Sequence, residues 1–188
     1  MDQTRQLGPI EQIRADHVKR YLFAAERLKN KRVLDLACGC GYGSWLLHGA
    51  GNEVTGVDIS SDALLYAEKH YQGPTYLRQR AEETKGEWDA LVCFETLEHL
   101  HDPLSVLQGI KAKTLIASVP NEVRFPFSAE KFDGDEFPHQ RHYTPFEFYE
   151  LLWAAGYTVN ELFCQKTKTG DVVPGLDGLF LIAVGSHD

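Results

Sequence analysis

The sequence lacks the features that would mark a membrane-spanning or secreted protein. No apolar stretch approaches the roughly 18 residues that a membrane-spanning helix requires. The opening segment MDQTRQLGPIEQIRADH is too polar for a signal peptide. The four cysteines form neither a C-x-x-C pair nor a zinc-binding spacing, and most lie in or beside apolar segments. We therefore expect a cytoplasmic protein without a membrane partner, in which the cysteines are reduced packing residues.

Basic residues are outnumbered and form no run. Lys and Arg number 19 against 27 Asp and Glu, which gives a formal net charge of −8 at pH 7. Tight non-specific binding to nucleic acid requires a positive surface that releases counterions. The composition therefore argues against a nucleic-acid partner, and it leaves the oligomeric state open.

Repeats, low-complexity segments and internal composition shifts are also absent. With 188 residues, of which 43% are hydrophobic, the chain is long enough to bury a core without disulfides. We therefore expect residues 1–188 to form a single domain.

Strand-like and helix-like segments alternate along the chain. Short apolar runs predict strands at residues 32–37, 53–57, 75–78, 88–94 and 113–119. Amphipathic or capped segments predict helices at 12–28, 43–50, 61–70, 103–110 and 144–155. Two further strands are expected as an antiparallel pair at 157–166 and 178–184. The alternation predicts an α/β fold with a mostly parallel sheet and helices on both faces.

The segment VLDLACGCGYG is the most informative part of the chain. An apolar strand gives way to Gly39, Gly41 and Gly43, a pattern typical of a strand, a tight loop and a helix. Glycine lets the loop turn sharply and leaves no Cβ between the backbone and a ligand, at which the helix N-terminus directs its amides. Asp58 ends the next strand, where it can accept hydrogen bonds from both ribose hydroxyls. The segment therefore predicts a nucleotide site.

The glycine spacing separates two classes of nucleotide site. A dinucleotide fingerprint, G-x-G-x-x-G, requires a glycine where this chain has Ser44 or Leu46. Asp35 followed by Gly39 and Gly41 instead resembles motif I of the class I S-adenosylmethionine (SAM)-dependent methyltransferases. The resemblance covers nearly the whole chain and implies a Rossmann-like, seven-stranded sheet that binds SAM.

The resemblance also assigns roles around the glycine loop. In the family, the acidic residue that corresponds to Asp35 contacts the methionine end of SAM, either through the amino group of SAM or through a water molecule. Gly39 and Gly41 border the cofactor, and Asp58 holds the ribose. Ala37 departs from the pattern, since the family usually has glycine there. Because alanine is small, we expect backbone strain at Ala37 rather than loss of SAM binding.

The adenine end is assigned by the same resemblance. The family has an acidic residue followed by a small one after the third strand, where this chain has Arg80, Ala81 and Glu82. The Ala81 amide would meet a ring nitrogen, Glu82 would accept from the amino group, and Ile59 would press on the adenine face. Arg80 and Glu82 are equally compatible with solvated surface charges.

The N-terminal segment RYLFA is similar to a lead-in common among glycan-associated methyltransferases, where it covers the cofactor. We therefore expect residues 1–30 to place a helix over the cofactor, with Tyr21 stacked over the site. An aromatic residue on an apolar helical face is also compatible with plain core packing. Phe94, at the end of the fourth expected strand, is a further expected cofactor contact.

The segment FETLEHL follows the fourth expected strand, at the sheet edge where ligands bind in such folds. In a helical turn Glu95, Glu98 and His99 share one face, which would suit a metal site or a general base. The segment resembles the E-x-x-E-H of ubiquinone-biosynthesis O-methyltransferases and of many sugar and glycan methyltransferases. It also resembles that of the small-RNA 3′-terminal 2′-O-methyltransferases, in which two glutamates and two histidines bind a divalent ion.

Residues 121–143 have no clear period and are too long for an ordinary connection, so we expect a functional loop on the substrate side. His139 lies five residues before Thr144, the spacing of the second metal histidine in the RNA group. The same pattern is common in glycan-pathway methyltransferases, which have no general metal requirement. The expected ligands of a divalent metal such as Mg²⁺ or Mn²⁺ are Glu95, Glu98, His99 and His139. The alternative is that Glu95 contacts the edge of the cofactor, and that Glu98 and His99 cap a helix or form a polar network.

The expected chemistry follows from SAM. Its sulfonium methyl is already electrophilic, so the protein mainly aligns the acceptor and removes its proton. His99 and His139 are the expected proton acceptors, because a neutral imidazole is available near pH 7, and Glu95 is the third expected catalytic residue. A bound cation would instead lower the pKa of the hydroxyl. Arg141 and Tyr143 are the expected substrate contacts, with Arg141 binding an anionic group.

The leading hypothesis is O-methylation of a small hydroxylated acceptor, such as a sugar, a sugar nucleotide or a phenol. A metal-dependent RNA 3′-terminal 2′-O-methyltransferase is the alternative within the same class. A non-catalytic nucleotide sensor and an NAD-dependent oxidoreductase are the alternatives outside it. The sequence does not identify the acceptor, because acceptor pockets are built by variable loops.

Overall fold

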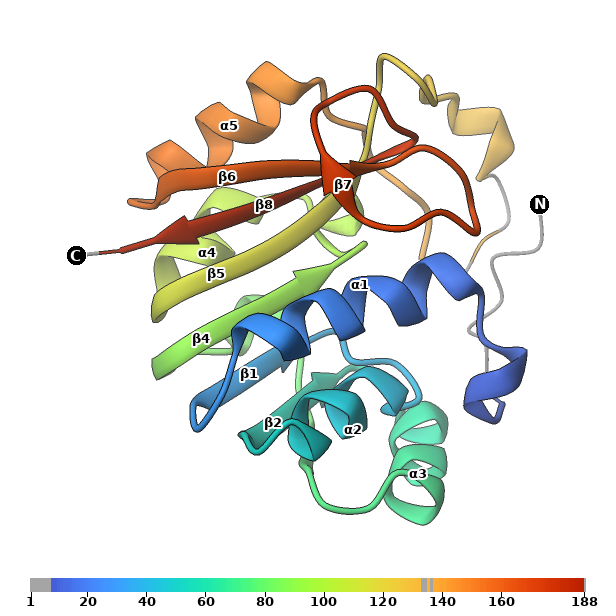
Figure 1. The fold of residues 1–188 in the computed structure, drawn as a ribbon, viewed down its shortest axis with the longest axis vertical. Helices are drawn as coiled ribbons and strands as arrows, with labels where there is room; N and C mark the ends of the chain where they lie inside the picture. The colour runs from blue at the N-terminus through green and yellow to red at the C-terminus, as the bar shows by residue number, and fades with distance from the viewer. Residues whose placement is uncertain (1–7, 133–134, 136, 188) are drawn as a thin grey trace.

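One mixed β-sheet runs through the molecule, with helices on both faces (Figure 1). The computed structural model describes residues 8–132, 135 and 137–187. The strand order is β3-β2-β1-β4-β5-β8-β6-β7. The strands are β1 Arg32–Leu36, β2 Glu53–Asp58, β3 Thr75–Arg78, β4 Gly86–Phe94, β5 Ile110–Pro120, β6 Thr158–Gln165, β7 Val173–Pro174 and β8 Phe180–Ser186. The predicted α/β fold is confirmed.

The first five strands are parallel and the last three antiparallel. β1 lies between β2 and β4, with β3 and β5 outside them, and all four of these pairings are parallel. β8 pairs antiparallel with both β5 and β6. The sheet has eight strands instead of the seven expected, because β7 forms a two-residue pairing with β6. A segment that short has no hydrophobic period, so the sequence does not reveal it.

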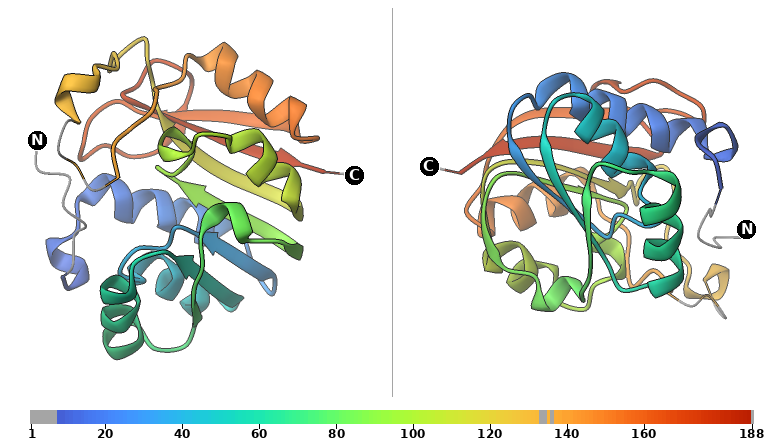
Figure 2. Two further views of the ribbon diagram at one scale, coloured as in Figure 1. Left: turned by 180° about the vertical axis from the view of Figure 1, so that it is seen from behind. Right: turned by 90° about the horizontal axis from the view of Figure 1, so that it is seen from below.

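The helices divide between the two faces of the sheet, as the views from opposite sides show (Figures 1 and 2). α1 and α2 cover one face, α4 and α5 cover the other, and α3 packs beside β2 and β3. The α-helices are α1 Ala15–Arg27, α2 Tyr42–Gly49, α3 Ser61–His70, α4 Pro103–Gly109 and α5 Pro145–Ala154. Short 3-10 helices are η1 Ile10–Gln12, η2 Ala81–Glu83, η3 Leu97–His99 and η4 Ala129–Lys131.

The central strands are buried on both faces, which explains their continuous apolar sequence. Val33 belongs to the core cluster under α1 and α2, whereas its neighbour Leu34 belongs to the cluster under α4 and α5. Val92 and Leu91 divide between the two clusters in the same way. The sheet therefore holds the carboxyl ends of β1 and β4 in fixed positions.

Helix boundaries agree with the capping residues in the sequence. Ser60 accepts a hydrogen bond from the Ala63 amide, and Asp102 accepts one from the Ser105 amide ahead of α4. Thr144 caps α5. Such caps each stabilise a helix by about 1 kcal/mol. The first helix is shorter than expected, because the chain is extended around residues 13–14 between η1 and α1.

None of the helices in the described part of the chain combines the length and apolar composition needed to cross a bilayer.

Candidate active site

A cavity of about 1190 Å³ opens at the carboxyl ends of β1, β2 and β4. Residues from α1, the glycine loop, the segments after β2 and β3, η3 and the 121–143 loop line its walls. Ligand pockets typically span about 300–1,000 Å³, so this cavity has room for a nucleotide-sized ligand and a second molecule. Its position is the sheet edge at which the sequence predicts binding.

The glycine loop crosses one wall of the cavity. Gly39 and Gly41 have left-handed backbones, with φ of 56° and 84°. A Cβ on Gly41 would lie 2.5 Å from the Cβ of Ala67 in α3. A Cβ on Gly43 would lie 2.1 Å from Cζ of Tyr21. Gly43 is therefore required for the close packing of α1 on α2, and not only for access to a ligand.

Ala37 lies at the end of β1 and lines the cavity. Its φ is 59°, which confirms the strain expected where alanine replaces the usual glycine. A left-handed backbone at a residue other than glycine costs about 1–3 kcal/mol. The rest of the fold therefore has to compensate for this conformation.

Asp58 is fixed at the end of β2 by two backbone amides. Its Oδ2 accepts a hydrogen bond of 2.9 Å from the Gly39 amide, and its Oδ1 accepts one of 2.8 Å from the Ser60 amide. The side chain is nearly buried and lines the cavity. The carboxylate is thus held in one orientation, at the position expected for a ribose contact.

Asp35 lies behind the cavity wall and does not line it. Its carboxylate accepts hydrogen bonds from the Ser44 hydroxyl at 2.6 Å and from the Tyr21 hydroxyl at 3.0 Å. The Tyr21 side chain does line the cavity. Asp35 thus orients Tyr21 and Ser44, and its expected contact with the methionine end of SAM stays a prediction.

The charge of Asp35 makes stability depend on pH. Burial raises the pKa of Asp35 to about 7, against the hydrogen bonds from Ser44 and Tyr21, which lower it. Between the unfolded pKa of about 3.9 and the folded value, the folded protein keeps a proton that the unfolded chain has released. The contribution of Asp35 to stability is therefore complete below about pH 4 and is lost as the pH rises toward 7.

Replacing Asp35 with asparagine should remove this dependence. We expect the free energy of unfolding of the parent protein to fall more steeply between pH 5 and pH 7 than that of Asp35→Asn, by up to about 1.4 kcal/mol per pH unit. Urea denaturation of both proteins at several pH values, without added ligand, measures the difference. Parallel curves would show that Asp35 ionises at its ordinary pKa in the folded protein.

Arg20 of α1 forms a buried network that the sequence did not reveal. Its guanidinium is 3.0 Å from the Asp16 carboxylate and 2.7 Å from Oε1 of Glu95, and it also donates to the Ser118 hydroxyl. Arg20 and Asp16 are almost completely buried. A basic residue on an amphipathic helix is usually solvated, and only the i, i+4 spacing of Asp16 and Arg20 could have indicated this pair.

Glu95 takes part in this network through one carboxylate oxygen. Its Oε1 contacts Arg20 and accepts a hydrogen bond of 2.8 Å from the Ser118 hydroxyl. The backbone of Glu95 is left-handed, with φ of 49°, which turns the chain between β4 and η3. Glu95 is not among the residues whose ligand atoms converge, so its place in the expected four-residue metal site stays a prediction.

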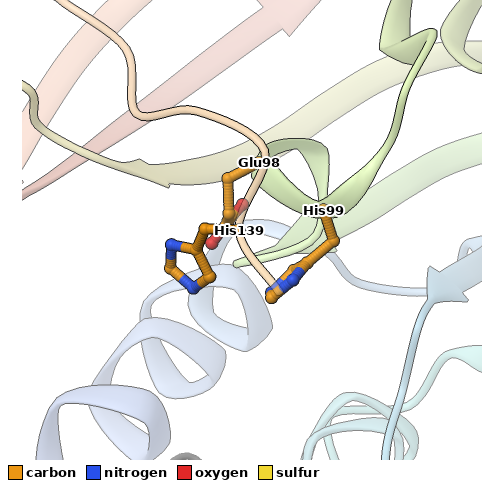
Figure 3. Close-up of side chains that lie close together, drawn as sticks. All are labelled: Glu98, His99 and His139. Atoms are coloured by element: carbon orange, nitrogen blue, oxygen red, sulfur yellow. The ribbon is translucent and has the colours of Figure 1, made fainter. Parts of the chain in front are cut away.

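Glu98, His99 and His139 do converge (Figure 3). One candidate ligand atom from each lies within 4.8 Å of the other two. Glu98 and His99 both belong to η3. The backbone N–H of Gln140 donates a hydrogen bond to the backbone carbonyl of Glu98, and this bond holds the neighbouring residue His139 beside η3. Both carboxylate oxygens of Glu98 and Nδ1 of His99 are buried without a hydrogen-bond partner in the described structure.

Burial controls the charge of this group. It raises the pKa of Glu98 well above its ordinary value, and the nearby Glu95 adds to the effect. It lowers the pKa of His99, and it lowers the pKa of His139 to about 3, helped by the other two histidines nearby. Both imidazoles are therefore neutral near pH 7, which is the form that binds a metal or accepts a proton.

The remaining expected cofactor residues lie around the cavity. The residues that line it include Tyr21, Ile59, Ala81, Glu82 and Phe94. The Glu82 carboxylate is 3.5 Å from the exposed guanidinium of Arg80. The adenine-end residues thus line the cavity, and their contacts with the cofactor stay predictions.

The two expected substrate residues do not line the cavity. Tyr143 is buried in the core, where its hydroxyl donates to the Leu97 carbonyl at 3.2 Å. Arg141 is exposed and lies over the Tyr143 ring at 5.6 Å. Neither residue is placed for the expected substrate contact, because Tyr143 bonds to the first residue of η3 in the core and Arg141 lies over the Tyr143 ring.

A comparison with known protein families covers the segments that line the cavity. A family model described as a methyltransferase domain matches residues 10–162, which include the glycine loop, η3 and the 121–143 loop. The chain belongs to this family. Together with the Rossmann-like sheet, the match identifies a class I SAM-dependent methyltransferase. It does not favour the oxidoreductase and nucleotide-sensor alternatives.

Several curated relatives of this methyltransferase share one name. This chain is 38% identical over 96 residues to the ubiquinone biosynthesis O-methyltransferase of Glaesserella parasuis, and the match covers 45% of this chain and 41% of that protein. It is 33% identical over 112 residues to the enzyme of the same name from Actinobacillus pleuropneumoniae, covering 53% and 47%. The chain thus spans less than half the length of these relatives.

Solved structures share the fold of this methyltransferase. A SAM-dependent methyltransferase from Thermotoga maritima, described as a possible histamine N-methyltransferase, has a TM-score of 0.75 and 20% identity over 93% of this chain and 91% of its own. Magnesium protoporphyrin IX methyltransferase from Synechocystis, solved with bound SAM, has a TM-score of 0.64 and 18% identity over 92% and 77%.

Proposed function

We propose that this methyltransferase transfers the methyl group of SAM to a hydroxyl of a small acceptor such as a phenol, a sugar or a sugar nucleotide. The observation that carries the proposal is the group of Glu98, His99 and His139 beside the SAM cavity. The names of the curated relatives support oxygen as the accepting atom. The formal charge of −8 favours a small acceptor over an RNA terminus.

The SAM end of the cavity is assigned on geometry. Gly39 and Gly41 leave the backbone open to the cofactor, and Asp58 is oriented by two amides for the ribose. Tyr21, held by Asp35, closes the cavity from α1. These contacts support a position of the sulfonium group between the glycine loop and η3, on the side of the cavity that Glu98 and His99 also line.

The same group fits a divalent cation. Glu98 is buried with both oxygens unpartnered, and an unpaired buried carboxylate costs several kcal/mol unless it is protonated or meets a cation. One carboxylate and two neutral imidazoles suit Mn²⁺ or another first-row metal better than Mg²⁺, which prefers oxygen ligands. We therefore propose that Glu98, His99 and His139 bind such an ion.

The residues around the acceptor would assist its deprotonation and keep water away from it. A divalent cation, when bound, lowers the pKa of a hydroxyl that contacts it. Without an ion, the neutral imidazoles of His139 and His99 can accept a proton but leave the pKa of the acceptor hydroxyl unchanged, so methyl transfer should then be slow. Leu100, Phe125 and Phe137 line the cavity near them and exclude water from the acceptor.

The proposal is tested by methyl transfer to a panel of hydroxylated acceptors. Purified protein is incubated with SAM and with phenols, sugars, sugar nucleotides or an RNA 3′ end, and products are analysed by mass spectrometry. We expect a mass gain of one methyl group on a small hydroxylated compound, lost after exhaustive chelation and restored by Mn²⁺. Calorimetry with SAM and with NAD should show binding of SAM alone.

Each part of the proposal has its own contrary result. Methylation of nitrogen instead of oxygen, or of RNA instead of small acceptors, would overturn the proposed acceptor. Activity that survives exhaustive chelation, in protein with which no metal co-purifies, would overturn the metal site while leaving the transferase intact.

A further inference from the structure

A second buried histidine contacts His139 within the 121–143 loop. Nδ1 of His139 lies 2.8 Å from Nε2 of His142. Nδ1 of His142 lies 2.6 Å from the carbonyl oxygen of Phe125. Both rings are buried, with exposed fractions of 8% for His139 and 5% for His142. The two imidazoles and the carbonyl thus form a continuous hydrogen-bonded chain.

The direction of this chain follows from the carbonyl at its end. A carbonyl oxygen only accepts, so Nδ1 of His142 must carry a proton. A neutral imidazole has a single N–H, so Nε2 of His142 is an acceptor. The His142 ring is buried against three phenylalanines, and the nearest carboxylate oxygen, Oε2 of Glu122, lies 4.0 Å from its Nδ1, beyond hydrogen-bonding distance. Such apolar surroundings favour the neutral imidazole. Nδ1 of His139 is consequently the donor, and the lone pair of His139 is on Nε2.

We propose that His142 is a positioning residue that fixes His139 in the tautomer protonated at Nδ1. The Nε2 lone pair is then the one offered to Glu98 and His99, as a metal ligand or proton acceptor. This inference rests on the proposed role of His139 in the active site. A histidine ligand is commonly oriented by a hydrogen bond from its other nitrogen, and here another histidine takes that part.

Aromatic packing prevents the two rings from escaping this arrangement. The Phe132 ring stacks on His139, with centroids 4.1 Å apart and planes 10° from parallel. Phe125 and Phe127 contact the His142 ring at centroid distances of 4.8 Å and 5.5 Å. Rotation of either imidazole would break these contacts together with the hydrogen bond. Figure 3 shows His139 entering from the loop toward Glu98 and His99.

Packing alone would require only a ring of similar size at position 142. His142→Phe keeps the ring and removes the acceptor, whereas His142→Gln loses the ring and retains an acceptor near the position of Nε2. The matched control is His70→Phe, which replaces an exposed histidine on α3 outside the cavity. The two variants at position 142 therefore separate hydrogen bonding from packing.

The decisive measurement is the histidine tautomer, read from long-range proton–nitrogen NMR spectra of protein labelled with ¹⁵N-histidine. We expect His139 to be protonated at Nδ1 in the parent protein, to shift toward the Nε2-protonated form in His142→Phe, and to return in His142→Gln. Mn²⁺ affinity, measured by electron paramagnetic resonance, should fall by about 10- to 100-fold in His142→Phe and recover in part in His142→Gln. His70→Phe should change neither.

The outcomes distinguish this inference from the proposed function. His139 protonated at Nε2 in the parent, or an unchanged tautomer in His142→Phe, would overturn the role of His142. If the tautomer responds as expected while no variant binds Mn²⁺, the role of His142 stands and the metal site of the proposed function fails.

Discussion

Replacing Glu98 with glutamine is expected to reduce kcat for methyl transfer by about 10²- to 10⁴-fold, which corresponds to the several kcal/mol that a metal site supplies in stabilising developing charge. Glutamine has the shape of glutamate but carries no charge, so it is a poor metal ligand. Mn²⁺ binding, measured by electron paramagnetic resonance, should be lost in parallel. Steady-state kinetics with the best acceptor at saturating SAM measures the first effect.

Stability should respond in the opposite direction to activity. The carboxylate of Glu98 is buried without a hydrogen-bond partner in the described structure, so a neutral side chain removes an unfavourable charge. We therefore expect Glu98→Gln, without metal, to unfold at the same or a higher urea concentration than the parent. The control Glu68→Gln replaces an exposed carboxylate on α3 and should change kcat by less than about twofold.

Kinetics, Mn²⁺ binding and stability of Glu98→Gln can each contradict this prediction. Unchanged kcat and unchanged Mn²⁺ affinity in Glu98→Gln would exclude a ligand role for Glu98. A lower stability without metal would show that the carboxylate makes a structural hydrogen bond.

Replacing Arg20 with methionine is expected to destabilise the protein by about 3–5 kcal/mol, the range found when one partner of a buried ion pair is removed. Methionine keeps most of the volume but leaves Asp16 and Glu95 without the buried guanidinium. The control Lys19→Met removes the neighbouring exposed pair with Asp171 and should cost less than about 1 kcal/mol. Urea denaturation at pH 7 measures both.

A second substitution identifies the cause of the loss. Asp16→Asn combined with Arg20→Met removes one of the two uncompensated charges, so the double variant should be more stable than Arg20→Met alone. Arg14 also contacts Asp16 at 2.6 Å and competes with this explanation. If Arg20→Met and Lys19→Met lose the same small amount, Arg14 and solvent compensate Asp16, and the buried network contributes little.

Local pattern was sufficient to predict the sheet and the edge at which the cavity opens. Val33 to Leu36 are buried, and this apolar run before three glycines has few structural solutions other than a strand, a loop and a helix. Asp58 was predicted because parallel strands end at one edge, and it does bond to the Gly39 amide across that edge. These features depend on residues close together in sequence.

The errors concern contacts between distant residues. Arg20 meets Glu95 across the sheet edge, and no spacing within either segment encodes that meeting. In this structure Oε1 of Glu95 contacts Arg20 and Ser118, whereas local spacing alone groups Glu95 with Glu98 and His99. Tyr143 was misplaced for a related reason: in the irregular chain before α5, the sequence does not show which side chains point inward.

The attachment of residues 137–143 to η3 has a thermodynamic consequence. The backbone N–H of Gln140 donates a hydrogen bond of 2.7 Å to the backbone carbonyl of Glu98, and the Tyr143 hydroxyl donates one to the backbone carbonyl of Leu97. Ordering a flexible segment on binding costs about 1–2 kcal/mol per residue in backbone entropy. Because these bonds form with the fold, that entropy is lost before any acceptor arrives, and selectivity among acceptors depends on shape and charge rather than on the ability to order the loop.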